Sequence, residues 1–171
     1  AAVLSQTYRV SKTPENHNND IGMPMAILGM PEDTQVAVLE MGMNHFREIA
    51  YLTSIALPDV AVITNIGTMH IEHLGSQQGI LQAKLEILEG MTEDGAVLLN
   101  GDDPLLWNLH KTLPNVTYFG EQNTQSKVLA HDVAETQTGT VFSVTCSDAA
   151  FTVQLPIEGR HYVADALAAI T

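Results

Sequence analysis

The sequence is poor in cysteine and in positive charge, and it has no long hydrophobic run. The single cysteine, Cys146, excludes an internal disulfide framework and is typical of a reducing compartment. No stretch approaches the roughly 20 consecutive apolar residues of a membrane helix, and the first residues lack the layout of a signal peptide. We therefore expect a cytoplasmic protein without membrane insertion. Only 7 Lys+Arg residues stand against 20 Asp+Glu, giving a net charge of −13, which disfavours nucleic-acid binding through phosphates.

Two common nucleotide-binding motifs are also missing. The sequence contains neither GxxxxGK[ST], the loop that cradles phosphates, nor GxGxxG, the dinucleotide fingerprint. What is present is a chain of 171 residues with 45% hydrophobic side chains, which is typical of one globular domain with a substantial core.

The first three quarters of the chain alternate short apolar runs with helical patterns. The predicted strands are Val36–Leu39, Val60–Ile63, Ala96–Leu99 and Val116–Phe119. The predicted helices are His45–Ala56, Gln77–Glu89 and Pro104–Thr112, the last with Asp102 or Asp103 as N-cap. This alternation predicts an α/β fold with a mostly parallel sheet flanked by helices.

The pattern changes near Lys127. Three runs then alternate apolar and polar residues, joined by Gly139 and by Ser147-Asp148: Val128–Val133, Val141–Cys146 and Phe151–Leu155. They predict a small antiparallel β meander. We divide the single domain into an α/β part at 1–126, the meander at 127–158 and the start of a helix at 159–171. Because residues 1–6 resemble the tail of a helix and the last helix has no cap, we expect a domain truncated at both ends.

Polar residues end three of the apolar runs. Glu40, Asn65 and Asn100 each occupy such a position, and a glycine follows each one closely. In open α/β sheets, ligands bind beyond the carboxyl ends of the strands, and glycine lets backbone approach a ligand. The three together predict a binding site at this edge.

Lys84 interrupts the apolar side of a predicted helix. At 100° per residue, the apolar arc of this helix contains Ile80, Leu81, Leu85, Ile87 and Leu88, and the solvated arc contains Gln78, Gln82, Glu86 and Glu89. Lys84 falls near the middle of the apolar arc. One interpretation is a side chain that extends along the helix to water. The other is a neutral amine, either catalytic or modified by CO₂ to a carbamate that could ligate a metal.

Glu40 and His70 are candidate metal ligands. A carboxylate suits Mg²⁺, and His70 lies in the loop after the Asn65 strand, although a hydrogen-bonded loop histidine is the simpler interpretation. His70 and His73 have a spacing that also occurs in zinc sites, but no cysteine or third histidine lies at a suitable spacing. The simplest interpretation of Asn19 or Asp20, and of Asn44 and His45, is as helix caps.

Five segments in this chain resemble the central domain of the Mur ligases, which has a P-loop NTPase-like α/β fold. They occur in the order found in that family and cover nearly the whole chain: NNDIGMPM (18–25), LEMGMNHFREI (39–49), ITNIGTMHIEHLGSQQGILQAKLEI (63–87), LNGDD (99–103) and GRHYVADALAA (159–169). The first two segments favour the branch of the family that adds D-alanyl-D-alanine.

The resemblance implies a role for each matching residue. Glu40 and His70 would bind Mg²⁺, and Lys84 would be the carbamylated lysine that holds a second metal. The residues implied to bind the substrate are Asn18, Asn19, Asn44 and His45, and those implied to bind the nucleotide are Asn65, Asn100, His161 and Asp165. Two asparagines of the family pattern are replaced here by Tyr162 and Asp165, and Arg47 stands where glycine is usual.

The resemblance also implies a reaction. ATP would activate the carboxylate of UDP-N-acetylmuramoyl-tripeptide as an acyl phosphate, and the amine of D-alanyl-D-alanine would displace phosphate, in a monomeric enzyme of peptidoglycan precursor synthesis. The P-loop of the family is absent, so we expect this segment alone to be inactive. Two alternatives remain open: another ligase of the superfamily, such as a folylpolyglutamate synthase, and a non-catalytic domain that retains the fold.

Overall fold

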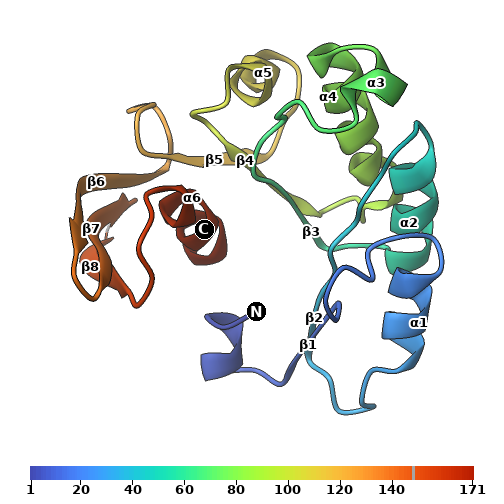
Figure 1. Ribbon diagram of the computed structural model, residues 1–171, viewed down its shortest axis with the longest axis horizontal. Helices are drawn as coiled ribbons and strands as arrows, with labels where there is room; N and C mark the ends of the chain where they lie inside the picture. The colour runs from blue at the N-terminus through green and yellow to red at the C-terminus, as the bar shows by residue number, and fades with distance from the viewer. Residues whose placement is uncertain (148) are drawn as a thin grey trace. The chain divides into compact units, whose positions relative to one another are not determined.

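Two sheets organise the computed structural model, which describes residues 1–147 and 149–171. The chain divides into two compact units (Figure 1). Unit 1 comprises Ala1–Ala61 and Gly67–Gly95, and unit 2 comprises Val62–Ile66 and Ala96–Thr171.

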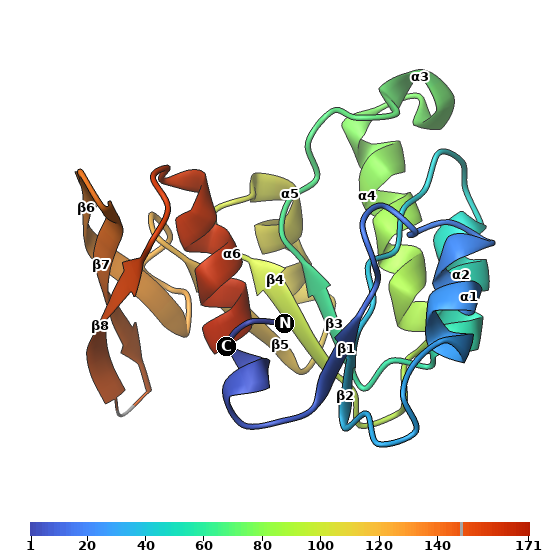
Figure 2. The ribbon, with the colours of Figure 1, turned by 60° about the horizontal axis from the view of Figure 1, so that its bottom comes forward.

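Unit 1 contains a short parallel sheet and a group of packed helices. Strand β1 (Val10–Lys12) pairs with β2 (Val36–Val38), with Val10 opposite Val36. The helical segments are η1 (Leu4–Gln6), α1 (Gly22–Leu28), α2 (Glu48–Ala56), α3 (Ile71–Leu74), α4 (Gln77–Leu85) and the 3₁₀ segment η2 (Glu86–Gly90). Helix α2 packs against α1, α4 and η2, and Figure 2 shows α1 and α2 side by side.

Apolar side chains from α1, α2 and α4 form the interior of unit 1. Met23, Leu52 and Ile80 are almost completely buried there. Thr53 is also fully buried, and its hydroxyl donates a hydrogen bond to the Ile87 carbonyl at 2.8 Å. This bond satisfies a buried polar group and joins α2 to η2.

Unit 2 is built on one mixed sheet. Its strands follow the order β3 (Val60–Ile63, of which the last two residues belong to this unit), β4 (Ala96–Asn100), β5 (Val116–Gly120), β6 (Val128–Thr136), β7 (Gly139–Cys146) and β8 (Ala149–Leu155). The pairs β4–β5 and β5–β6 are parallel, and β6–β7 and β7–β8 are antiparallel. The antiparallel strands therefore continue the parallel sheet.

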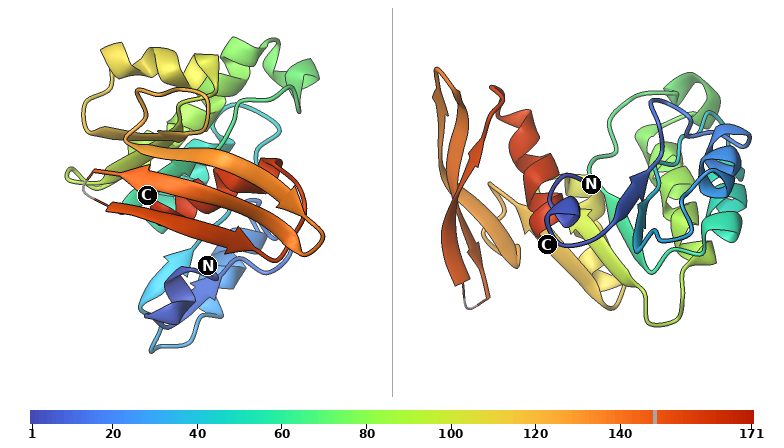
Figure 3. Two further views of the ribbon diagram at one scale, coloured as in Figure 1. Left: turned by 90° about the vertical axis from the view of Figure 1, so that its left-hand side faces the viewer. Right: turned by 90° about the horizontal axis from the view of Figure 1, so that it is seen from below.

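Helix α6 (His161–Ile170) covers one face of that sheet, as Figure 3 shows. Val163 and Leu167, one helical turn apart, pack into a cluster with buried side chains of β4, β5, β6 and β7, including Phe119 and Phe142. Cys146 lies partly buried against the same cluster. The other helical segments of unit 2 are α5 (Pro104–Trp107) and η3 (Asn108–Lys111).

The predicted fold class is confirmed, and the differences lie at the ends of elements. Helix α2 begins at Glu48 and not at His45, because Arg47 has a left-handed backbone with φ of 74° that no α-helix accepts. The α-helix predicted to reach Glu89 ends at Leu85 and tightens into η2. Asp148, part of a predicted turn, lies outside the described residues. In the described part of the chain, no helix has the length and apolar character needed to cross a membrane.

Candidate functional site

Glu40 and Asn18, predicted as a metal ligand and a substrate-binding residue, are in direct contact in unit 1. Glu40 follows β2, and its backbone N–H donates to the hydroxyl of the buried Thr13 at 3.0 Å. The Asn18 side-chain amide donates to Glu40 Oε1 at 2.8 Å, and the Gly42 N–H donates to the Asn18 carbonyl at 2.8 Å. A Cβ at Gly42 would lie only 2.8 Å from the amide of the Asn18 side chain, so a larger residue here would displace that amide from Glu40.

Asn19 has the capping role that the sequence indicates. Its side-chain oxygen accepts hydrogen bonds from the N–H groups of Gly22 at 2.7 Å and Ile21 at 3.3 Å, at the start of α1. Asn19 and Asn18 therefore belong to one ordered loop, in which Asn18 points to Glu40 and Asn19 supports the helix.

The loop with Asn44 and His45 is held by Glu48, the first residue of α2. Glu48 Oε2 accepts hydrogen bonds from the backbone N–H of Asn44 at 2.5 Å and of His45 at 3.2 Å, and Oε1 lies 3.2 Å from His45 Nδ1. Burial raises the pKa of Glu48, but the two N–H groups and His45 outweigh it and lower the pKa below 4.5. The side chains of Asn44 and His45 are therefore not the caps of α2.

The cap of α2 comes from Glu86. This carboxylate is only 7% exposed, and its two oxygens accept the Arg47 N–H at 2.8 and 2.9 Å and the Ala50 N–H at 3.2 Å. The prediction that Glu86 lies on the solvated arc is therefore wrong. The physical reason is that the N–H groups at the start of α2 need acceptors, and a carboxylate also complements the positive end of the helix.

Lys84 and His70 lie on neighbouring segments of unit 1. Lys84 is half-buried in the last turn of α4, and His70 is half-buried with a left-handed backbone (φ of 63°) immediately before α3. The exposed ring of His73 lies 4.8 Å, between centroids, from the ring of His45.

The Glu40 carboxylate suits a hard cation such as Mg²⁺, whereas the imidazole of His70 is a softer donor. Glu40 is exposed, and Asn18 occupies one of the about four lone-pair positions of a carboxylate. Among the described residues, no three His, Cys, Asp or Glu side chains gather into a group that could hold a metal. Glu40 and His70 would therefore need a further ligand, and a carbamate on Lys84 has the oxygen atoms that Mg²⁺ prefers.

Asn100, a predicted nucleotide-binding residue, connects the ends of two strands in unit 2. Its amide nitrogen donates to the Thr64 carbonyl at 2.9 Å, and its side-chain oxygen accepts the Asp102 N–H at 2.9 Å. Both polar ends of this side chain hold the carboxyl edge of β3 and β4 in place. Asn65, the next residue after Thr64, is exposed at the same edge.

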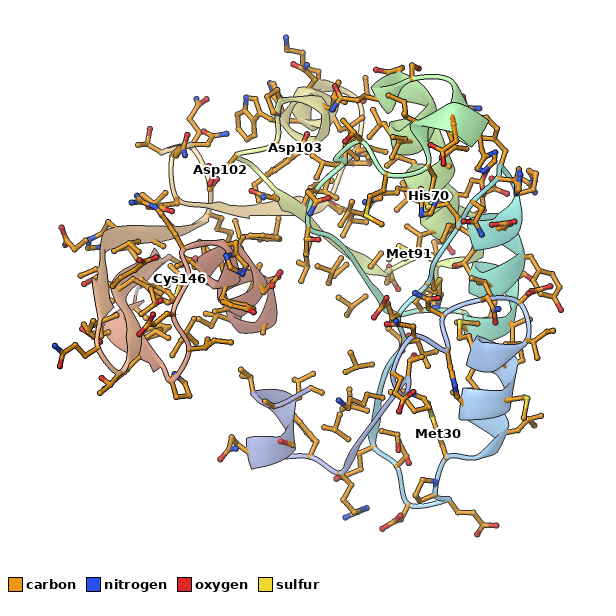
Figure 4. The ribbon with its side chains drawn as sticks, in the orientation of Figure 1. Met30, His70, Met91, Asp102, Asp103 and Cys146 are labelled. Carbon is orange, nitrogen blue, oxygen red and sulfur yellow. The ribbon has the colours of Figure 1, made fainter. Side chains whose placement is uncertain are left out.

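Two aspartates after β4 complete this edge, and Figure 4 shows both next to α5. Asp103 is the N-cap of α5, as predicted, and its other oxygen accepts the Ile66 N–H at 2.9 Å. Asp102 accepts three backbone N–H groups at the start of the β5–β6 loop, from Glu121, Gln122 and Asn123, at 2.6 to 2.9 Å.

His161 and Asp165 lie on one face of α6 because they are four residues apart. Both are exposed, and the His161 ring lies 4.1 Å, between centroids, from the Tyr162 ring. The preceding Arg160 pairs with Glu121, and its N–H donates to Glu135 at 3.1 Å. These contacts hold the start of α6 against the β5–β6 loop and β6.

Sequence reasoning missed Glu48, Glu86 and Asp102 as residues that shape these loops. Glu48 had a usable signal, because a glutamate three residues after a loop residue at a helix start is the spacing of a capping box. Glu86 had none, because its partners Arg47 and Ala50 are 39 and 36 residues away in the chain.

Comparison with known proteins identifies the family. Residues 1–171 match the family model of the Mur ligase middle domain. A UDP-N-acetylmuramoyl-tripeptide–D-alanyl-D-alanine ligase of Bacillus subtilis is 46% identical over 169 residues, which cover 99% of this chain and 36% of the relative.

Solved structures give the same result. MurF from Acinetobacter baumannii superposes with a TM-score of 0.91 at 32% identity, over 99% of this chain and 37% of that one. MurF from Thermotoga maritima in complex with ADP superposes with a TM-score of 0.87 at 30% identity, over 98% and 39%. The chain thus spans between 36% and 39% of the length of these proteins. Because the match extends over its whole length, the chain belongs to the Mur ligase middle-domain family.

Proposed function

We propose that this chain is the middle domain of an ATP-dependent ligase that joins D-alanyl-D-alanine to UDP-N-acetylmuramoyl-tripeptide in peptidoglycan precursor synthesis. The observation that carries the proposal is the 46% identity, over 99% of the chain, to a relative with that activity in its name. The ADP complex of the T. maritima neighbour supports a nucleotide substrate. We place the enzyme in the cytoplasm as a monomer.

The metal and the muramoyl substrate would use residues of unit 1. Glu40, His70 and a carbamylated Lys84 would hold Mg²⁺, which when bound offsets negative charge on phosphate groups. Asn18 would orient the Glu40 carboxylate through their 2.8 Å hydrogen bond. Asn44 and His45 would contact the substrate, with their backbone held by Glu48. Asn19 would shape the same surface through its cap on α1.

The nucleotide would use residues of unit 2. Asn65, His161 and Asp165 have exposed side chains for contacts with adenine or ribose. Asn100 would act differently, because both polar groups of its side chain already hold the backbone at Thr64 and Asp102. We assign it the role of shaping the strand edge against which the nucleotide lies.

The reaction would proceed in two steps. The tripeptide carboxylate attacks the γ-phosphate of ATP and forms an acyl phosphate, with ADP as leaving group. The amine of D-alanyl-D-alanine then attacks the acyl carbon, loses a proton, and displaces inorganic phosphate through a tetrahedral intermediate. Groups that hold the two reactants in position lower the barrier because they remove the entropic cost of bringing them together.

The direct test is an assay of the full-length protein with UDP-N-acetylmuramoyl-tripeptide, D-alanyl-D-alanine and ATP–Mg²⁺. We expect equal amounts of ADP, phosphate and the pentapeptide product. Activity with folate substrates only would replace the proposal with a folylpolyglutamate synthase function. A full-length protein with an intact P-loop that bound no ATP–Mg²⁺ would instead be a non-catalytic relative.

The role of Lys84 has its own test. We expect Lys84→Ala to abolish turnover in the full-length enzyme and short carboxylic acids to restore part of it, because they would supply the missing anion. Measured turnover that is unchanged by the substitution would contradict the carbamate role. Lys111→Ala, an exposed lysine of unit 2, is the control and should leave turnover unchanged.

A further inference from the structure

The loop between Glu40 and α2 has no regular structure of its own. Residues 41–47 form neither helix nor strand, and they carry Asn44 and His45, whose side chains are exposed. Such a loop presents two side chains in one geometry only if other groups hold its backbone. The question is which groups do so.

Two carboxylates hold this loop, one from within α2 and one from another element. Glu48 accepts the N–H groups of Asn44 and His45. Glu86 accepts the N–H of Arg47, at the end of the loop, with both oxygens. Hydrogen bonds from backbone N–H to a carboxylate are stronger than those between neutral groups, so the two together define the path of the loop.

Glu86 also explains the unusual backbone of Arg47. A left-handed backbone at a residue other than glycine costs roughly 1–2 kcal/mol. At φ of 74°, the Arg47 N–H points to the buried carboxylate, and the hydrogen bonds offset this cost. The Arg47 side chain bonds elsewhere, to the exposed Glu89 at 2.7 and 2.9 Å.

The position of Glu86 in the chain means that its contact with Arg47 also connects the loop to the helix of Lys84. Glu86 follows the last residue of α4, two positions after Lys84. A shift of the helix that carries Lys84 would therefore be transmitted to the loop that carries Asn44 and His45, and through Met41–Met43 to Glu40. Displacements of about 1 Å in such groups cost large factors in rate.

We infer that Glu86 is a positioning residue: it holds the substrate-side loop of Asn44 and His45 in register with the helix of Lys84. The inference rests on the proposed function for the identity of the substrate. The contacts themselves do not depend on it. Glu86 touches neither substrate nor metal in this role.

The test compares Glu86→Gln with Glu89→Gln in the full-length enzyme. Both remove one negative charge from η2, but only Glu86 contacts the backbone of the loop, whereas Glu89 pairs with the Arg47 side chain. We expect Glu86→Gln to raise the KM for UDP-N-acetylmuramoyl-tripeptide about tenfold, the effect of losing a charged hydrogen bond, with the KM for ATP within about twofold. Glu89→Gln should leave both KM values unchanged.

Glu48→Gln is the second variant, and it keeps the inference testable if Glu86→Gln does not fold. It loosens the same loop from the other side and should also raise the KM for the muramoyl substrate selectively. Equal changes in both KM values, or no change, in the folded variants would overturn the inference. Amide hydrogen exchange at Arg47 and Ala50 provides a readout that needs no activity: exchange should accelerate in Glu86→Gln and not in Glu89→Gln.

These readouts distinguish a failure of the proposed function from a failure of the role inferred for Glu86. A wild-type enzyme without D-alanyl-D-alanine-adding activity would refute the proposed function while the exchange data still decide the role of Glu86 in the loop. An active wild type with an unaffected Glu86→Gln variant would refute the inference alone.

Discussion

Two residues beside the candidate site, Arg47 and His70, have left-handed backbones immediately before a helix. This region is unfavourable for side chains larger than glycine, so neighbouring contacts must select it. For Arg47 the selecting contact is the buried Glu86 carboxylate. Strain at these positions shows that the loops before α2 and α3 are shaped by packing and hydrogen bonding more than by local preference.

Replacing Arg47 by glycine, the residue usual here in the resembling family, should stabilise the protein. Glycine removes a strain of roughly 1–2 kcal/mol, and the exposed pair with Glu89 that is lost contributes about 0–1 kcal/mol. We expect a net gain of about 1 kcal/mol in the free energy of unfolding, measured by urea denaturation. Arg47→Ala loses the pair and keeps the strain, so it serves as the control. A glycine variant less stable than the alanine variant would contradict this account.

Glu48 should give the protein a specific pH dependence. Its pKa in the folded protein is below 4.5, so its ionised form stabilises the fold. That contribution is fully present above about pH 4.5 and is lost as the pH falls through the lowered pKa. The side chain is 39% exposed, so solvent screening keeps the effect small.

The measurement is the difference in thermal midpoint between wild type and Glu48→Gln as a function of pH. We expect the wild type to be more stable at about pH 6 and its advantage to shrink by about pH 3. A difference that stayed constant over this range would show that Glu48 does not act through its charge.

At the scale of elements, the sequence predicted the strands and helices that have strong hydrophobic patterns. It did not predict β1, since Val10–Lys12 is short and only partly buried. It also placed Glu86 in solvent, because a helical projection shows no sign that the N–H groups of Arg47 and Ala50 at the start of α2 need an acceptor on this side of the helix. Long-range acceptors such as Glu86 cannot be found from local periodicity, since their partners lie on another element.

Asp102, two residues after β4, holds the start of the loop between β5 and β6. Removing the Asp102 carboxylate in Asp102→Ala leaves three backbone N–H groups without their acceptor. We expect a loss of about 2–3 kcal/mol in the free energy of unfolding and faster amide exchange at Glu121, Gln122 and Asn123. Asp94→Ala, at an exposed position, should change neither quantity. Unchanged exchange at the three amides would contradict the assigned contact.

At the scale of the whole molecule, the candidate residues divide by function. All metal and substrate candidates belong to unit 1, and all nucleotide candidates belong to unit 2. The sequence motifs supplied these candidates, but periodicity contains no information on which of them share a unit. The hydrogen bond from Asn18 to Glu40, which are 22 positions apart in the chain, is a contact between two candidates that periodicity could not predict.

The 171-residue chain by itself should bind Mg²⁺ only weakly. Among the described residues no three carboxylate, histidine or cysteine side chains converge, and phosphate oxygens are missing without the nucleotide. We expect calorimetry to give an affinity of about millimolar or weaker, further reduced by Glu40→Gln. A tight isotherm that Glu40→Gln leaves unchanged would place the metal elsewhere.

The two-residue separation between Lys84 and Glu86 fixes the angle, around the helix axis, between the directions of their two side chains. An α-helix turns about 100° and a 3₁₀ helix about 120° per residue, so the two side chains leave the backbone in nearly opposite directions. Glu86 is directed to the start of α2, and Lys84 is directed away from it. A single inserted or deleted residue here would rotate one side chain out of its direction whatever its chemical identity. In natural variants of this domain, the length of this segment should therefore vary less than its composition.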